Sequence, residues 1–273
     1  MKKLIILIFP LFLSSGLYAQ KRNDNAIALH WGVGNIMRQD LTVSPFIHKK
    51  WSPVNVLMSY SRSNKLIHFA DLKFSFYNPS IVEPYAYNSF YGGEQTSMPN
   101  SFKLIDFNYA LGKTVLEKSP WELVIGGKSR NHIYASDYNF GPSGPSPMHV
   151  SFGLDLWLNL KYALNKKHYF TTNLSLPLFA YIYRVPYLAQ DDQYFETIYS
   201  HNGITEFASR IKDGQLQSWG VSQRFDFDVR YGYVINEKWD IGMNYLLSMN
   251  FNQLPTRISQ IENAIYLSGK YKF

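Results

Sequence analysis

Residues 150–162 read VSFGLDLWLNLKY, and they show the clearest alternation of apolar and polar side chains in the chain. Every second residue from Val150 to Tyr162 is large and apolar. The residues between them are Ser151, Gly153, Asp155, Trp157, Asn159 and Lys161. A helix, with a period of about 3.6 residues, would not separate these two sets, whereas a strand points successive side chains to opposite faces. The stretch therefore predicts a β-strand with one apolar face and one largely polar face.

The length of this strand fits a lipid bilayer. At about 3.3 Å per residue and a tilt near 45°, a strand of this length rises roughly 30 Å. An apolar band about 25 Å tall with aromatic borders is typical of transmembrane β-barrels. The strand is therefore long enough to cross such a band.

Two segments near the C-terminus repeat the pattern. Apolar and aromatic residues alternate with charged or small polar residues over 225–233 and again over 239–251. A soluble β-sandwich also alternates, but it does not usually put charged residues on the inner face of strand after strand. Lipid outside and water inside explain this arrangement. We therefore expect an all-β fold, a transmembrane antiparallel up-and-down β-barrel.

Composition supports a membrane surface. Aromatic residues make up 17% of the chain and charged residues only 17%, whereas globular domains carry about a quarter charged residues. The chain has no cysteine, so its stability must come from backbone pairing and burial, and a lipid-bearing cysteine is excluded. The formal charge of +7 predicts mild attraction to anionic lipid and no nucleic-acid partner.

The N-terminus has the pattern of a secretory signal. Lys2 and Lys3 precede a short apolar run from Leu4 to Leu13, and small residues follow. We place the cleavage after Ala19, so the predicted organisation is a signal peptide over 1–19 and an outer-membrane barrel domain over 20–273. The apolar run is too short to span about 30 Å of hydrocarbon as a helix.

Short and long connections alternate along the chain. Short polar turns are expected near 62–65, 114–120, 163–167 and 235–238, and longer irregular segments near 36–53, 78–100, 136–148, 185–218 and 252–257. Outer-membrane barrels place short turns in the periplasm and long loops outside. The pattern predicts about ten strands, with twelve still open, and both termini in the periplasm. We read 41–51 as an extension above the membrane, and Pro177 predicts a bulge.

The last strand resembles the C-terminal signature of Gram-negative outer-membrane β-barrel proteins. Residues 261–273 alternate apolar and polar positions, and Tyr271 and Phe273 occupy the aromatic places. The resemblance implies an outer-membrane location and insertion by the barrel-assembly machinery. It names no functional subfamily.

Two constellations suggest chemistry. His149 and Ser151 resemble the dyad of outer-membrane phospholipases and lipid A deacylases, but no third polar residue stands at the spacing those families use. Asp226 and Asp228 resemble the acidic pairs of omptin proteases, but Arg224 and Arg230 flank them and indicate a structural role. We therefore expect no enzyme, with a lipid hydrolase as the alternative. The scattered histidines predict no metal site, and we expect no cofactor.

Many predicted inward positions are charged. They are Asp71, Lys73, Asp106, Glu122, Lys128, Asp155, Lys161, Arg224, Asp226, Asp228, Arg230, Asp240, Glu262 and Lys270. Barrels of around eight strands can fill their interior with side chains, whereas those with sixteen or more leave a channel. We expect a lumen mostly closed by paired charges, and a narrow pore for small solutes is the alternative.

The long connections are rich in the residue types that anchor interfaces. We expect the external loops to bind a protein or glycan partner through Tyr85, Tyr87, Tyr91, Tyr187, Tyr194, Phe195, Tyr199 and Arg210. Disordered segments contain few aromatic residues, so the aromatic content of these connections indicates that they are not simply disordered. The predicted function is thus a non-enzymatic, monomeric surface protein of the outer membrane, in contact with its lipid.

Overall fold

In the computed structural model, the described residues (24–81, 85–89, 92–138, 147–184 and 203–273) form one β-barrel with short external elements. The barrel strands are β1 (Asp24–Asp40), β2 (Ser44–Ser63), β3 (Ile67–Tyr77), β6 (Ser101–Lys118), β7 (Trp121–Asp137), β8 (Met148–Ala163), β9 (His168–Arg184), β11 (Ser222–Val234), β12 (Trp239–Asn252) and β13 (Ile258–Lys272). The predicted signal peptide, 1–19, lies outside the described residues.

The barrel is closed and antiparallel throughout. Its strands follow the order β9-β11-β12-β13-β1-β2-β3-β6-β7-β8, and β8 pairs with β9 to complete the ring. The first and last strands pair over the full width of the sheet, from Ala26 opposite Lys272 to Asp40 opposite Ile258. Closure satisfies the backbone groups of every strand without water, as a membrane barrel requires. The prediction of an up-and-down barrel with ten strands is confirmed.

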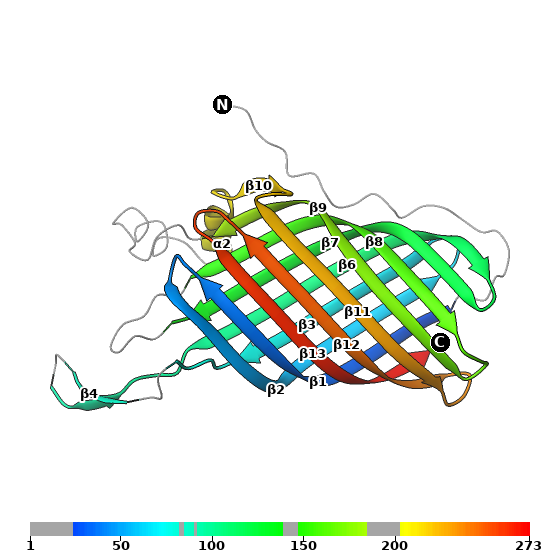
Figure 1. Ribbon diagram of the computed structural model, residues 1–273, viewed down its shortest axis with the longest axis horizontal. Helices are drawn as coiled ribbons and strands as arrows, with labels where there is room; N and C mark the ends of the chain where they lie inside the picture. Colours follow the sequence, from blue (N-terminus) through cyan, green and yellow to red (C-terminus); the bar gives the residue numbers. More distant parts are fainter. Residues whose placement is uncertain (1–23, 82–84, 90–91, 139–146, 185–202) are drawn as a thin grey trace.

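All the long connections lie at one end of the barrel, which also holds the short β1–β2 turn, residues 41–43 (Figure 1). The turns that follow β2, β6, β8 and β11 are short and lie at the end that also holds the C-terminus. There the backbone N–H of Phe273 donates to the carbonyl of Asn25 over 2.9 Å. This alternation matches the predicted topology, and we call this end the terminal end and the opposite one the loop end.

The prediction of an irregular segment over 36–53 was wrong. β1 continues to Asp40 and β2 begins at Ser44. The two strands pair up to Asp40 opposite Ser44. Arg38 lies opposite His48 in this extension. The outward positions of this extension include Gln39 and Lys49, so the apolar outer face that marks the other strands is absent here. The extension predicted for 41–51 is therefore a continuation of two barrel strands.

The prediction that 185–218 has no secondary structure was wrong for its second half. Helix α2 (Gly203–Ile211) and strand β10 (Gln215–Ser218) lie within it. β10 pairs with Phe179 to Ile182 of β9 and lies outside the ring, at the top in Figure 1. Strands β4 (Ala86–Asn88) and β5 (Glu94–Thr96) likewise form a small hairpin within the 78–100 connection.

The bulge predicted at Pro177 is confirmed. The β8–β9 register shifts there, because Leu154 lies opposite Phe179 whereas Asp155 lies opposite Pro177. Pro177 has no N–H to donate to a neighbouring strand. The pairing between β9 and β11 ends just before it, at Ser175 opposite Asp226. β9 is thereby free to pair with β10 at the loop end.

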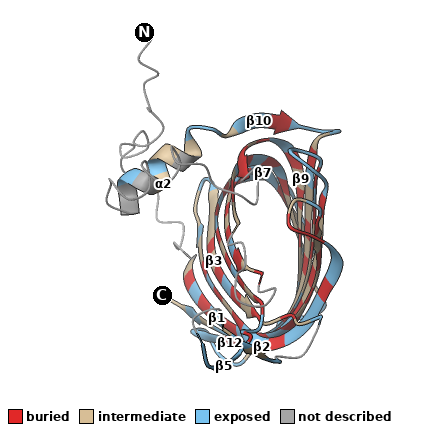
Figure 2. Ribbon diagram, turned by 90° about the vertical axis from the view of Figure 1, so that its left-hand side faces the viewer, coloured by how far each residue is buried: buried red, intermediate tan, exposed pale blue. Residues whose placement is uncertain are grey.

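The two faces of the wall differ as the alternation predicts (Figure 2). Leu154 and Leu156 are 39% and 36% exposed on the outside, whereas Asp155 and Trp157 are 0% and 1% exposed on the inside. Aromatic pairs such as Trp121–Tyr162 and Trp239–Tyr271 gather near the terminal end. They match the aromatic border of a membrane barrel. No helix in the described part of the chain is long and apolar enough to span a membrane.

Deleting 271–273 should sharply reduce barrel assembly. Tyr271 contacts Trp239 at a ring-centroid distance of 5.0 Å and pairs with Ile27 across the β1–β13 seam. Loss of that pairing leaves backbone groups unsatisfied in lipid at a cost of several kcal/mol each. The measurement is the amount of heat-modifiable protein in the outer membrane. Phe273→Tyr, which keeps an aromatic terminus, should assemble normally. Normal levels of the deletion variant would refute a sorting role for these residues.

Candidate functional site

The loop end of the lumen is filled by an aromatic cluster. Its buried members are Ile36, Val43, Tyr77, Phe102, Leu104, Tyr134 and Tyr138. These side chains come from β1, β3, β6 and β7 and from the turns above them. Their arrangement leaves the lumen packed like a protein interior at this level.

Two buried arginines, Arg38 and Arg184, link the elements around this aromatic cluster. The Arg38 guanidinium lies 3.5 Å from the Tyr134 ring centroid and donates to Gln260 over 2.6 Å. Asp40 accepts from Arg38 over 3.2 Å and from Arg184 over 2.9 Å. Arg184 also donates to the carbonyls of 254 and 256, each over 2.7 Å. These bonds tie the loop end of β9 to β1 and to the β12–β13 turn.

His48 borders the cluster in the β1–β2 extension. Burial and the positive charge of Arg38 lower the pKa of His48 to about 4, so the ring is neutral near pH 7. The Asn100 amide lies 3.3 Å from its Nδ1 and Ser44 Oγ lies 3.1 Å from its Nε2. A neutral ring with its proton on Nε2 satisfies both contacts, because the amide donates to Nδ1.

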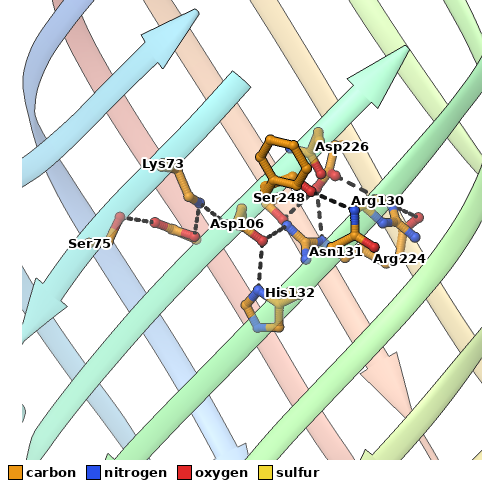
Figure 3. Close-up of polar contacts among 12 residues, drawn as sticks. Lys73, Ser75, Asp106, Arg130, Asn131, His132, Arg224, Asp226 and Ser248 are labelled. Carbon is orange, nitrogen blue, oxygen red and sulfur yellow. Dashed lines mark hydrogen bonds and ion pairs between the residues drawn. The ribbon is translucent and has the colours of Figure 1, made fainter. Parts of the chain in front are cut away.

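A buried network of ion pairs occupies the middle of the lumen (Figure 3). Lys73 pairs with Asp106 over 3.0 Å and with Glu262 over 2.7 Å. Asp106 also accepts from Arg224 over 2.9 Å, and His132 Nδ1 lies 2.6 Å from the same carboxylate. The side chains of Lys73, Asp106, His132 and Glu262 are each no more than 4% exposed.

The network continues to the opposite wall. Arg224 pairs with Asp226 over 3.3 Å, and Asp226 pairs with Arg130 over the same distance. Arg130 pairs with Asp155 over 2.8 Å. Together these bonds join β3, β6, β7, β8, β11 and β13 across the barrel. We call the set Lys73, Asp106, Arg130, His132, Asp155, Arg224, Asp226 and Glu262 the mid-lumen network.

Little space remains around the mid-lumen network. One cavity of about 10 Å³ lies between Arg130, His132 and Arg224, and one of about 50 Å³ lies beside Asp71 and Lys128. The first is about large enough for one water molecule. At this level the lumen holds these two small cavities between side chains. Toward the terminal end it widens into a cavity of about 1040 Å³.

The predicted inward charges mostly face the lumen. The mid-lumen network contains six of them, and Asp71, Lys128, Asp228 and Asp240 are also buried inside. Four buried residues were missed by the sequence analysis: Arg130 and His132 of the mid-lumen network, and Arg38 and Arg184 of the loop end. Arg130 and His132 share the face of Lys128 by alternation, so the period-two pattern of β7 could have revealed them.

The dyad candidates face the lumen but do not form a catalytic pair. Both ring nitrogens of His149 lack a hydrogen-bond partner within the described residues, so no third group orients its imidazole. Ser151 lies opposite His132 in the β7–β8 register. The histidine that lies beside a carboxylate is His132, which contacts Asp106, and not His149. The acidic pair is held by arginines, as expected, because Asp226 contacts Arg224 and Asp228 contacts Arg230 over 2.7 Å.

The predicted loop residues are only partly described. Tyr85 and Tyr87 lie at the β4–β5 hairpin with their rings 6.4 Å apart, and Tyr85 is 48% exposed. Arg210 lies in α2, whose side-chain detail at this residue is outside the described part. Tyr91, Tyr187, Tyr194, Phe195 and Tyr199 fall outside the described residues, so their role stays a prediction. Within the described ranges, no three potential ligands gather around a metal position.

Similarity to solved structures supports the architecture. The outer membrane protease OmpT from Escherichia coli superposes with a TM-score of 0.56 at 9% identity, covering 94% of this chain and 99% of that one. The β domain of the Bordetella autotransporter BrkA has a TM-score of 0.44 at 8% identity, covering 92% of this chain and all of that one. Neisserial surface protein A has a TM-score of 0.34 at 10% identity, covering 91% and 97%. No protein-family model and no curated protein sequence matches the chain. The similarity to OmpT and the closed ring of ten strands show that the chain has the fold of outer-membrane β-barrel proteins.

Proposed function

We propose that this chain is a non-conducting barrel of the outer membrane that acts by binding a partner at its loop end. The observation that carries the proposal is the closed lumen, in which the aromatic cluster lies above the mid-lumen network. A solute crossing the barrel would have to separate Lys73 from Glu262, which are 2.7 Å apart. Breaking a buried pair costs about 3–5 kcal/mol. The function then lies at the two ends of the barrel and not along its axis.

The outer surface supports the membrane location. Its exposed side chains include Trp31, Phe107, Leu154, Leu156, Met243, Ile265 and Leu267. A soluble monomer rarely exposes so continuous an apolar surface. The Trp121–Tyr162 and Trp239–Tyr271 pairs border this surface at the terminal end, which we place in the periplasm.

Purified protein in a planar bilayer should give no discrete conductance steps. The small-solute pore is the alternative, and its current would have to pass cavities of about 10 and 50 Å³ in the mid-lumen region. The measurement is single-channel current in neutral and in acidic buffer, with a sixteen-stranded porin as the positive control. Reproducible steps from the folded, heat-modifiable protein would establish the pore and refute the non-conducting proposal.

The loop end offers a surface for a partner. The β4–β5 hairpin projects beyond the strands (Figure 1) and carries Tyr85 and Tyr87. On the opposite side, Leu216 of β10 and the adjacent Trp219 are 70% and 59% exposed. Exposed aromatic side chains of this kind are enriched at interfaces. The partner we propose is a protein or a glycan outside the cell.

Replacing 187–214 with a short Gly/Ser linker should preserve assembly but abolish the partner interaction. The replacement removes α2 but keeps β10, whose pairing with Phe179 to Ile182 closes the edge of β9. Assembly is measured by heat modifiability, and binding by co-purification from native membranes. The matched control replaces 139–146 with a linker of equal flexibility, which keeps Tyr138 of the aromatic cluster, and should retain the partner. A linker variant that assembles and still retains its partner would show that 187–214 is not the recognition element.

A further inference from the structure

The terminal end of the lumen holds a large blind cavity. It measures about 1040 Å³ and is lined by all ten barrel strands or the turns that join them. Ligand sites in proteins typically measure about 300–1,000 Å³. The mid-lumen network closes its inner side, so a molecule that enters from the terminal end cannot pass through. We call this space the terminal cavity.

One wall of the terminal cavity is apolar and well fixed. The Trp157 and Phe69 rings stack with 17° between their planes, and Trp157 Nε1 donates to Asn173 over 3.3 Å. Ile67 and Phe69 pack against Trp157 and are only half-buried, so part of their surface faces the cavity. Such a wall can hold a ring or a short hydrocarbon chain.

The lining of the terminal cavity also carries positive charge that its carboxylates do not balance. Lys270 of β13 lines the cavity and lies directly opposite Asp240 in the β12–β13 register. Asp240 is already occupied, because it accepts from Lys272 over 2.7 Å and from Tyr169 over 3.0 Å. The cavity lining as a whole contains seven Lys or Arg and four Asp or Glu side chains.

Lys161 is also free to bind an anion, because its only ion pair within the described residues is long and exposed. Its nearest carboxylate is Glu122, at 3.8 Å, and its side chain is 47% exposed. An ion pair of that length and exposure is weak. Arg230, in contrast, is held by two short contacts to Asp228, at 2.7 and 2.9 Å. The cations Arg62, Lys166 and Lys238 lie in or beside the turns at the mouth of the cavity. Among the cations deeper on the strands, Lys161 and Lys270 are the two that an incoming anion can engage most readily.

We infer that the terminal cavity binds a small amphipathic anion. Its phosphate, carboxylate or sulfonate head lies between Lys161 and Lys270, and its apolar body lies against Phe69 and Ile67. A charge-assisted hydrogen bond to lysine holds the head. The site is independent of the loop-end surface, since the mid-lumen network separates the two. The barrel would therefore carry a ligand on the side that faces the periplasm.

Calorimetry on the intact barrel in phosphatidylcholine nanodiscs tests this inference. The probe is phenyl phosphate, titrated at low salt, and the comparison probes are inorganic phosphate and the neutral phenyl glucoside. We expect saturable binding of phenyl phosphate at one per barrel. Each comparison probe should bind at least about tenfold more weakly, because one lacks the apolar body and the other lacks the charge. Equal binding of inorganic phosphate would refute the apolar part of the site.

The lysines are tested with a matched pair of double variants. Lys161→Gln with Lys270→Gln should weaken phenyl phosphate binding by about tenfold or more, because both head contacts lose their charge. Lys113→Gln with Lys118→Gln removes two exposed lysines outside the cavity lining and should bind as the native chain does. Both variants are first checked for heat modifiability. Unchanged affinity in the cavity variant, or an equal loss in the control, would overturn the inference. If the cavity variant fails to assemble, the test rests on the native chain. The inference is then refuted if the native barrel does not bind phenyl phosphate more tightly than both comparison probes.

Discussion

Asp106→Asn should lower the free energy of unfolding by about 3–5 kcal/mol, the cost of removing one charge from a buried ion pair. Asp106 joins three partners at once, since Lys73, Arg224 and His132 all contact its carboxylate. The carboxylate is 2% exposed, so water cannot replace the lost charge. Asparagine keeps the shape of the side chain and leaves Lys73 and Arg224 with fewer compensating charges. The variant therefore tests whether the mid-lumen network holds the barrel together.

Urea unfolding of the barrel in lipid vesicles measures this effect. The matched control is Asp137→Asn, the same substitution at a carboxylate that is 41% exposed and 3.7 Å from Lys103. Exposed ion pairs contribute about 0–1 kcal/mol, so the control should change stability little. Equal effects in the two variants would show that the network contributes no more than a surface ion pair does.

Much of the barrel could be predicted because lipid imposes a simple rule on each strand. Leu156 must face out and Asp155 must face in, and a slip of one residue would exchange them. The structure places Asp155 opposite Lys128 and Leu156 opposite Gly127, as that register requires. The strand count followed from the alternating connections, and the bulge from the missing N–H of Pro177.

The partners inside the barrel could not be predicted in the same way. Lys73 and Glu262 are 189 residues apart, and Arg38 and Gln260 are 222 apart. Which inward side chains meet depends on the stagger of the strands around the ring, and alternation within one strand does not determine that stagger. The sequence could therefore indicate a charged lumen but not the contacts of the mid-lumen network.

The loop end was harder to predict from the sequence, because the rule of lipid outside and water inside no longer applies there. The β1–β2 extension has Gln39 and Lys49 on its outward face, where a membrane strand would show apolar side chains. β10 adds to β9 from outside the ring, a pairing that depends on the bulge at Pro177. Of the eight predicted binding residues, the structure describes the side chains of Tyr85 and Tyr87, and both lie on the projecting hairpin.

Leu156→Arg should destabilise the barrel by about 2–4 kcal/mol, the cost of an outward arginine at the bilayer midplane. Leu156 lies in the middle of β8 with its side chain 36% exposed on the outer face. It lies opposite Gly127 on one side and Leu176 on the other, so no carboxylate stands beside it on the neighbouring strands. The guanidinium would have to reach the headgroups or draw water into the hydrocarbon, and either carries a cost.

The matched control is Leu164→Arg, which introduces the same side chain in the β8–β9 turn. Leu164 is 51% exposed at the terminal end, where the aromatic border gives way to water. The depth dependence of arginine in a membrane barrel falls to about 0–1 kcal/mol near the interface. Both variants are compared with the native chain by urea unfolding in the same vesicles. If Leu156→Arg were no more destabilising than Leu164→Arg, the outer face of β8 would not be in hydrocarbon. The proposed placement of the barrel in the membrane would then be wrong.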